Sequence, residues 1–300
     1  MRIFQVDAFT ATRFTGNPAS VVLDADGLSD DTLSAVAREY AHAEVAFVLA
    51  ASGADHDVHL RFFNSRKEAP FVGHATLAAH SVLLALGRRK VGACRQLSGT
   101  GIIEVTAHTD SAATRAGARI EFCQSVPELE TPLPFKTTLH VAEALRLPAT
   151  QLHEVMPARV ARKGSTRLLV PVADVRQLDT LAPNLDTLVR LGNELGVEGF
   201  FVFGVNRSPE LSTESRMFCP ALGIPEDPVS GNAHAMLAAY LWDLGQFGKR
   251  KHTVSFIGHQ GIKMQRPGQV NVRLEVDQGR LTAVHIGGTS VIVSEGTLAL

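Results

Sequence analysis

An internal repeat constrains the fold of this 300-residue chain more than any other feature. Four short blocks recur in the same order, at offsets of 154 to 158 residues. They are DTL at 31–33 and 186–188, EVAFV at 44–48 with EGFFV at 198–202, RFF at 61–63 with RMF at 216–218, and GHATLAAHSVLLALG at 73–87 with GNAHAMLAAYLWDLG at 231–245. An offset of about half the chain argues against a solenoid of many short repeats. We therefore predict two homologous domains, residues 1–128 and 129–300, with a linker at the proline-rich segment 126–134 and a last strand that can cross back to the first domain.

Two kinds of helix are predicted in each half. Residues 29–40 have the apolar spacing of an amphipathic helix, and a counterpart begins near Asn184. The helices at 73–87 and 231–245 are apolar on all sides, which is typical of a core element. Many short strand-like runs surround them, and this favours an α+β fold over alternating βαβ units. We expect each half to be a β-barrel-like sheet wrapped around one buried helix.

Composition narrows the possible partners and the compartment. Lys plus Arg total 29 and Asp plus Glu total 30, so the chain lacks the basic excess of a dedicated nucleic-acid binder. No uninterrupted apolar stretch approaches the eighteen residues or so of a membrane span. Three scattered cysteines favour reduced thiols, and the predicted location is the cytoplasm. We therefore expect a small molecule as partner, with neither nucleic acid nor membrane.

The starts of the two apolar helices are candidate anion sites. Each begins with glycine and one polar residue, Gly73-His74 and Gly231-Asn232. A helix start has unpaired N–H groups and partial positive charge, and glycine permits a ligand to approach that backbone closely. Two such ends in a cleft between the domains would suit a carboxylate. Ordinary capping, with Asn232 as N-cap, explains the same residues equally well.

Glu44 is the candidate general acid or base. It lies among alanines and valines, where loss of hydration is expected to raise its pKa toward neutral. His42 would share its strand face, and the repeat places Glu198 at the matching position of the second half. A glutamate on an edge strand that faces solvent is the alternative interpretation.

Asp227 is a further candidate, because two prolines stiffen the acidic segment PEDPVSGNA at 225–233. A rigid acidic turn, formed by Asp227 and Glu226, is the simpler explanation of that segment. Other chemistry lacks support, since the chain has no H-E-x-x-H or paired C-x-x-C motif, no nucleophile elbow and no phosphate loop. We expect neither a metal nor a cofactor. The remaining histidines considered are interpreted as packed or solvated: His80, His140, His234 and His285.

Taken together, these motifs resemble one known family. FTGNPASVVL at 14–23, AEVAFV, RFF, GHATLAAH, PEDPVSGNAHA and IGGTSVIVSEGTLAL follow the order found in the PhzF-like family, the phenazine-biosynthesis isomerase group with a diaminopimelate epimerase-like fold. The resemblance covers essentially the whole chain. The combination of GNP, GHAT and EDPxxG carries its specificity.

This resemblance implies a fold, an activity and roles for particular residues. The fold is two similar β-barrels, each around a central helix, with the active site in the cleft and often a homodimeric assembly. The activity is a cofactor-free isomerisation of a dihydro-hydroxyanthranilate, in which a glutamate moves a proton between ring carbons. Glu44 occupies that glutamate's position, while His74 and Asp227 match substrate contacts. We expect Asn232 to orient the substrate, and the N–H groups of Gly73 and Gly231 to bind its carboxylate.

Some positions depart from relatives of this fold. Ala43 replaces a common serine, and Asn232 stands where the phenazine enzyme has serine, which leaves the substrate open. Val72 and Ser230 occupy the positions of the two catalytic cysteines in thiol-dependent racemases, so that chemistry is excluded. The alternative to an isomerase is a non-catalytic member that binds a small molecule or a protein, because fold does not dictate function.

Overall fold

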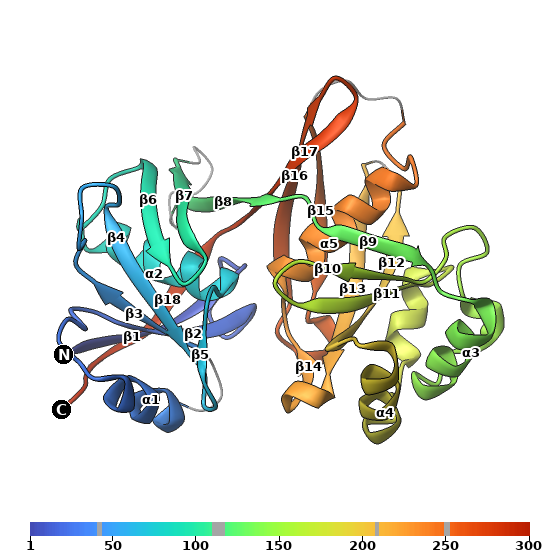
Figure 1. Ribbon diagram of the computed structural model, residues 1–300, viewed down its shortest axis with the longest axis horizontal. Helices are drawn as coiled ribbons and strands as arrows, with labels where there is room; N and C mark the ends of the chain where they lie inside the picture. Colours follow the sequence, from blue (N-terminus) through green and yellow to red (C-terminus); the bar gives the residue numbers. More distant parts are fainter. Residues whose placement is uncertain (41–43, 110–117, 208–209, 249–252) are drawn as a thin grey trace. The chain divides into compact units, whose positions relative to one another are not determined.

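The computed structural model describes the chain except for residues 41–43, 110–117, 208–209 and 249–252 (Figure 1). His42 and Ala43 therefore lie outside the described residues. Two compact units are present: unit 1 comprises Met1–Cys123 with Gly287–Leu300, and unit 2 comprises Gln124–Ile286. The predicted halves met at residue 128, and the units meet five residues earlier, at Cys123. In the part of the chain that is described, no helix has the length and apolarity needed to cross a membrane.

Unit 1 is a sheet with one helix on each face. Its elements are β1 (Arg2–Ala8), β2 (Asn17–Val22), α1 (Asp30–Glu39), β3 (Glu44–Leu49), β4 (Val58–Phe63), β5 (Glu68–Ala69), α2 (Gly73–Ala85), β6 (Gly92–Ser98), β7 (Gly101–His108), β8 (Arg119–Ser125, which runs past the unit boundary) and β18 (Ser290–Thr297). Along the sheet, β18 pairs with β1, β1 with β2, β2 with β3, β3 with β4, β4 with β6, and β6 with β7. The β2–β3 and β4–β6 pairs are parallel, and the others are antiparallel.

Unit 2 repeats this order of pairing. Its elements are β9 (Glu128–Pro132), α3 (Phe135–Ala144), β10 (Arg159–Arg162), β11 (Thr166–Pro171), α4 (Leu185–Leu195), β12 (Gly199–Asn206), β13 (Ser212–Cys219), β14 (Ile224–Asp227), α5 (Gly231–Asp243), β15 (Val254–Gln260), β16 (Gly268–Asp277) and β17 (Arg280–Gly288, which ends in unit 1). The described residues of this unit also form the short 3-10 helices η1 (Ala149–Gln151), η2 (Val175–Thr180), η3 (Pro220–Leu222) and η4 (Ile262–Met264). The β11–β12 and β13–β15 pairs are parallel, as are their counterparts in unit 1.

The helices predicted from apolar spacing are confirmed. Ser29 caps α1 by accepting a hydrogen bond from the Thr32 N–H, and Asn184 caps α4 through the Thr187 N–H. The predicted linker at 126–134 is wrong, because β9 lies within it and pairs with β10. The helix α3, which starts immediately afterwards, was not predicted from the sequence.

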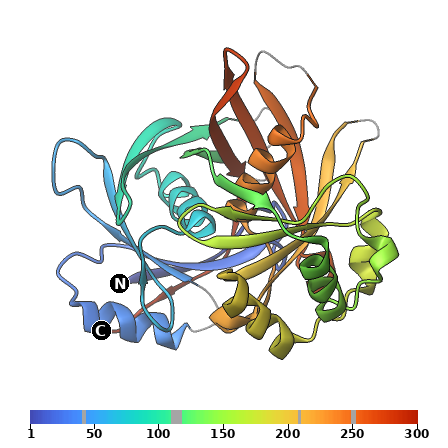
Figure 2. The same ribbon diagram turned by 45° about the vertical axis from the view of Figure 1, so that its right-hand side comes forward.

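The two all-apolar helices are buried as their composition requires. One core cluster packs Ala75, Ala78 and Val82 of α2 against β1 to β4, and a second cluster packs α1 against the opposite face of the same strands. In unit 2, α3 and α4 cover one face, while Phe201 and Phe203 of β12 contact α5 on the other. Figure 2 shows the strands of unit 1 around α2 (teal) and those of unit 2 beside α5 (orange). The faces towards α2 and α5 are called inner faces below.

The strand register corrects one pairing of the repeat. In the β3–β4 pair of unit 1, Val45 lies opposite Phe63, the last residue of the RFF block. In the β12–β13 pair of unit 2, Phe200 lies opposite Phe218, the last residue of the RMF block. Val45 therefore corresponds to Phe200. By the same register Glu44 corresponds to Gly199, and the prediction that Glu198 takes its place is wrong. A shift of one residue reverses the face on which a side chain lies.

Each buried helix contains one fully buried histidine, as predicted for His80 and His234. Arg89 donates to Nδ1 of His80, whose Nε2–H donates to Gln96 Oε1 at 2.9 Å. Nδ1–H of His234 donates to the Ser230 carbonyl at 2.7 Å. Burial lowers the pKa of His80 to about 3 and that of His234 to about 4. Both rings are therefore neutral in the folded chain at pH 5.

We expect acid to destabilise the fold through these two histidines. Below the ordinary pKa of 6.5 the unfolded chain binds protons that the folded chain cannot, so stability falls as the pH drops through that value. At pH 5 the loss is roughly 2 kcal/mol for each histidine. Urea unfolding at pH 8 and pH 5 measures it. His80→Gln should remove its share of the difference, whereas the exposed control His140→Gln should keep all of it. A full wild-type pH dependence in His80→Gln would contradict this account.

Candidate functional site

Glu44 and His74 lie together at one end of the unit 1 helix α2. Glu44 is the first residue of β3, and it shares the inner face with Ala46 and Val48, which pack on α2. His74 is the second residue of α2. The Glu44 Oε2 and His74 Nε2 atoms are 3.2 Å apart, and the side chains are 27% and 12% exposed. The structure therefore brings a carboxylate and an imidazole together at a half-buried position beside a helix start.

The pKa of Glu44 is shifted in the opposite direction from the prediction. Burial raises the pKa of the carboxyl group, as the apolar sequence around it suggested. The hydrogen bond from His74 and the charge of that ring outweigh burial, and the net pKa lies below its ordinary value of 4.5. Glu44 is therefore a carboxylate at neutral pH, in the form that accepts a proton.

The start of α2 leaves its first turn without a side-chain cap. Val72 is the N-cap residue and provides no acceptor for the first N–H groups. At Gly73, an added Cβ would lie 3.0 Å from Cζ of Phe122, so the packing of that ring also favours glycine. Ordinary side-chain capping does not account for this helix start.

The start of α5 is built differently. Ser230 is the N-cap and accepts from the Ala233 N–H, so the interpretation of Asn232 as the N-cap is wrong. The Asn232 amide nitrogen donates to the Lys163 carbonyl at 3.0 Å and to Ser165 Oγ at 2.8 Å. Its two hydrogens are thereby used to hold the turn between β10 and β11. The side-chain oxygen of Asn232 is its remaining polar group.

Asp227 is the last residue of β14, and α5 begins four residues later, at Gly231. It pairs with Met217 of β13, and paired residues share a face, so Asp227 lies on the inner face of unit 2. Gln260 fixes the turn after it: its Nε2 donates to the Asp227 carbonyl at 2.6 Å and its Oε1 accepts from the Ser230 N–H at 3.0 Å. Both ends of the turn are thus held by one buried side chain.

Glu226 has a structural role that the sequence analysis missed. Arg216 binds it through Nε at 2.9 Å and Nη2 at 2.8 Å, while Nη1 donates to two backbone carbonyls of unit 2. In unit 1, Arg61 binds Glu68 through the same two nitrogens, at 2.8 and 2.7 Å. The signal was present as the repeated pattern E-x-P-x-x-G at 68–73 and 226–231. These two ion pairs hold the strands that precede the buried helices.

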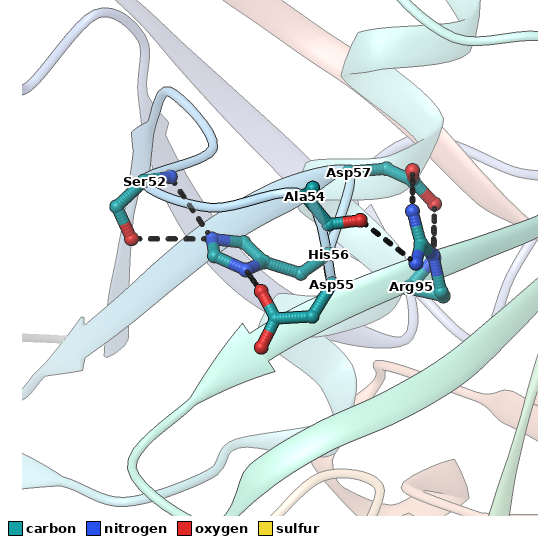
Figure 3. A network of polar contacts seen from close by, with 6 residues as sticks. All are labelled: Ser52, Ala54, Asp55, His56, Asp57 and Arg95. Atoms are coloured by element: carbon teal, nitrogen blue, oxygen red, sulfur yellow. Dashed lines mark hydrogen bonds and ion pairs between the residues drawn. The ribbon is translucent and has the colours of Figure 1, made fainter.

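A serine, a histidine and an aspartate also meet in the β3–β4 loop, where they superficially resemble a hydrolase triad (Figure 3). Asp55 Oδ1 lies 2.7 Å from His56 Nδ1, and Ser52 Oγ lies 3.3 Å from His56 Nε2. The Ser52 backbone N–H donates to the same Nε2 at 3.0 Å. Because that lone pair is already used, His56 cannot serve as a base for the Ser52 hydroxyl in this conformation. The arrangement stabilises the loop.

Among the described residues, no group of three or more histidine, cysteine or acidic side chains is arranged to hold a metal. Glu44, His74 and Gly73 belong to unit 1, while Asp227, Asn232 and Gly231 belong to unit 2.

Comparison with known proteins identifies the family. The family model described as phenazine biosynthesis-like protein, PhzC-PhzF, matches residues 6–296. The chain belongs to this family. An uncharacterized isomerase, YddE of Escherichia coli K12, is 34% identical, and the match covers 100% of this chain and 98% of the relative.

Solved structures agree with the fold. A PhzF-family phenazine biosynthesis protein of Bacillus anthracis superposes with a TM-score of 0.89 at 24% identity, over 100% of this chain and 99% of that one. A hydroxyproline epimerase of Agrobacterium vitis superposes with a TM-score of 0.61 at 16% identity, over 99% and 91%. The predicted α+β, diaminopimelate epimerase-like fold is confirmed.

The contact between His74 and Glu44 predicts how the pKa of Glu44 should change when His74 is replaced. In His74→Leu the effect of burial remains and the hydrogen bond is lost, so the pKa of Glu44 should rise above 4.5. Carbon-13 NMR of labelled glutamate carboxyls measures this, with Glu44→Gln to assign the signal. His59→Leu, on β4 of the same unit, should leave the Glu44 titration unchanged. An unaltered Glu44 pKa in His74→Leu would show that the imidazole does not control it.

Proposed function

We propose that this protein is a cofactor-independent isomerase that moves a proton between carbons of a small carboxylated substrate resembling a dihydro-hydroxyanthranilate. Membership of the PhzF family supports isomerase-type chemistry, and several curated relatives carry the name isomerase. The observation that carries the proposal is the 3.2 Å contact between Glu44 and His74 at the start of a buried helix. We further propose a cytoplasmic location, on the basis of the three scattered cysteines, and a homodimer, as the family resemblance implies.

The proposed reaction uses Glu44 first as a base and then as an acid. As a carboxylate, Glu44 accepts a proton from one carbon of the substrate, and the electron pair of that C–H bond enters the conjugated system. The neutral acid then formed has a low pKa and readily returns the proton to a second carbon. His74 keeps the carboxyl oriented and stabilises its charged form. N–H groups at Gly73 and Gly231, with Asp227 and Asn232, would hold the polar groups of the substrate.

Isotope transfer tests this reaction directly. The enzyme is incubated with a dihydro-hydroxyanthranilate in D₂O, and the product is analysed by NMR for deuterium at carbon. In parallel, substrate deuterated at the reacting carbon reports internal transfer of the same hydrogen. Gain of solvent deuterium, or retention of the label at a new carbon, supports proton transfer. Product formation with neither, or no product from this substrate class, counts against the proposal.

Glu44→Gln should lower turnover by at least about a hundredfold, the usual scale of acid/base catalysis. Glutamine keeps the size of the side chain and cannot carry the proton. Glu39→Gln, an exposed substitution in α1, serves as the control and should retain wild-type turnover. Thermal melting checks that both variants are folded. Near-normal turnover in a folded Glu44→Gln would remove Glu44 from the role.

A non-catalytic binding protein on the same fold is the alternative. It predicts substrate binding without isotope transfer in the wild type, and equal binding in Glu44→Gln. The close approach of Glu44 to His74 favours the enzyme, because binding alone does not require a proton acceptor in contact with an imidazole.

A further inference from the structure

A buried arginine in unit 2 stands where the repeat would place an alanine. Ala19 of β2 lies opposite Glu44 of β3, and Arg167 of β11 lies opposite Gly199 of β12. Since Gly199 corresponds to Glu44 in register, Arg167 corresponds to Ala19. At these two facing positions, unit 1 therefore has an alanine and a glutamate, whereas unit 2 has an arginine and a glycine.

The Arg167 side chain lies on the inner face of unit 2. Its neighbours Leu168 and Val170 pack in the core under α3 and α4, so Arg167 lies on the opposite face of the strand. A Cβ added to Gly199 would lie 3.1 Å from Arg167 Cδ. The arginine thus occupies the space above Gly199 that a side chain at this position would need. Only 10% of the Arg167 side chain is exposed.

The hydrogen bonds of Arg167 leave one edge of its guanidinium without an acceptor. Nη1 donates to the Thr166 carbonyl at 2.9 Å and to Glu198 Oε2 at 3.3 Å, and Glu198 is 46% exposed. Within the described residues, Nε and Nη2 of Arg167 have no hydrogen-bond acceptor. In Arg61 and Arg216 this same Nε–Nη2 edge binds a carboxylate with two hydrogen bonds. The desolvation of a buried cation destabilises the fold when its ion pair is a single long contact to a half-exposed carboxylate. A second anion bound to the guanidinium would offset that penalty.

Arg167 and Asp227 both act electrostatically on one thiol, that of Cys219. Burial raises the pKa of the Cys219 thiol to about 12, and among nearby charges Arg167 lowers that pKa while Asp227 raises it. Arg167 and Asp227, both on the inner face of unit 2, therefore lie within electrostatic range of the same thiol. The inner face of unit 1 presents Glu44 and His74 at the start of α2.

We propose that Arg167 binds the carboxylate group of the substrate through its Nε–Nη2 edge. The planar fork of a guanidinium matches the two oxygens of a carboxylate, and such paired hydrogen bonds are among the strongest in proteins. The ligand class is a small organic acid whose body carries a polar group for Asp227. The identity of that acid as the substrate rests on the proposed function, whereas the binding of a carboxylate at Arg167 does not.

Calorimetric titration with anthranilate and with its neutral amide tests the proposal on the full chain. Both probes share a ring and an amino group, and only anthranilate carries a carboxylate. Arg167→Met should weaken anthranilate binding by about ten- to a hundredfold, the scale of hydrogen bonds to a charged group. Binding of the amide should not change. Arg167→Lys, which keeps the charge and loses the fork, should fall between Met and wild type.

Arg190→Met, in the exposed part of α4, is the matched control and should bind both probes as the wild type does. Thermal melting establishes that each variant is folded, and Arg167→Lys provides the test if Arg167→Met does not fold. Equal loss of both probes, unchanged anthranilate binding in both Arg167 variants, or a wild type that does not bind anthranilate would overturn the proposal. Glu44→Gln should bind anthranilate normally, so loss of turnover with intact binding separates this site from the proposed chemistry.

Discussion

The structure depends on the burial of one helix without a polar face in each half. Neither α2 nor α5 has a side that water can cover favourably, so strands must enclose it, and α1, α3 and α4 lie on the opposite face of those strands. A helix enclosed in this way exposes its ends more readily than its sides. The unpaired N–H groups at the start of such a helix become the polar surface that the sheet leaves open. The groups proposed to bind the substrate lie at these helix starts, beside Gly73 and Gly231.

The two halves share the supports of these helix starts and differ in the side chains placed beside them. Each half retains an arginine–glutamate pair that anchors the strand before the helix, Arg61 with Glu68 and Arg216 with Glu226. The inner-face residues beside the helix starts differ at every corresponding position considered. The pairs, unit 1 first, are Ala19 and Arg167, Glu44 and Gly199, Ala69 and Asp227, and His74 and Asn232. The ion pairs that hold the strands are thus common to both halves, whereas the side chains beside the helix starts are not.

The sequence predicted the parts that depend on periodicity and missed those that depend on long-range contacts. Apolar spacing was sufficient for α1, α2, α4 and α5, and short-range hydrogen bonds explain the caps at Ser29 and Asn184. Prolines at 126–134 indicated a linker, yet β9 forms there because β10 lies alongside and supplies its partners. The match of Glu198 to Glu44 failed by one residue, since sequence similarity does not define strand register.

The same limit explains the pKa of Glu44. The apolar neighbours of Glu44 are local in sequence, and they correctly predicted the contribution of burial. The opposing contribution comes from His74, thirty residues further along the chain, and no local pattern announces that contact. Its consequence is chemical: a base with a low pKa is weak, so removal of a proton from carbon requires a substrate whose C–H bond is already acidified. Conjugation in the substrate and hydrogen bonds to its developing negative charge would supply that acidity, which makes the groups that bind the substrate as necessary to the rate as Glu44 itself.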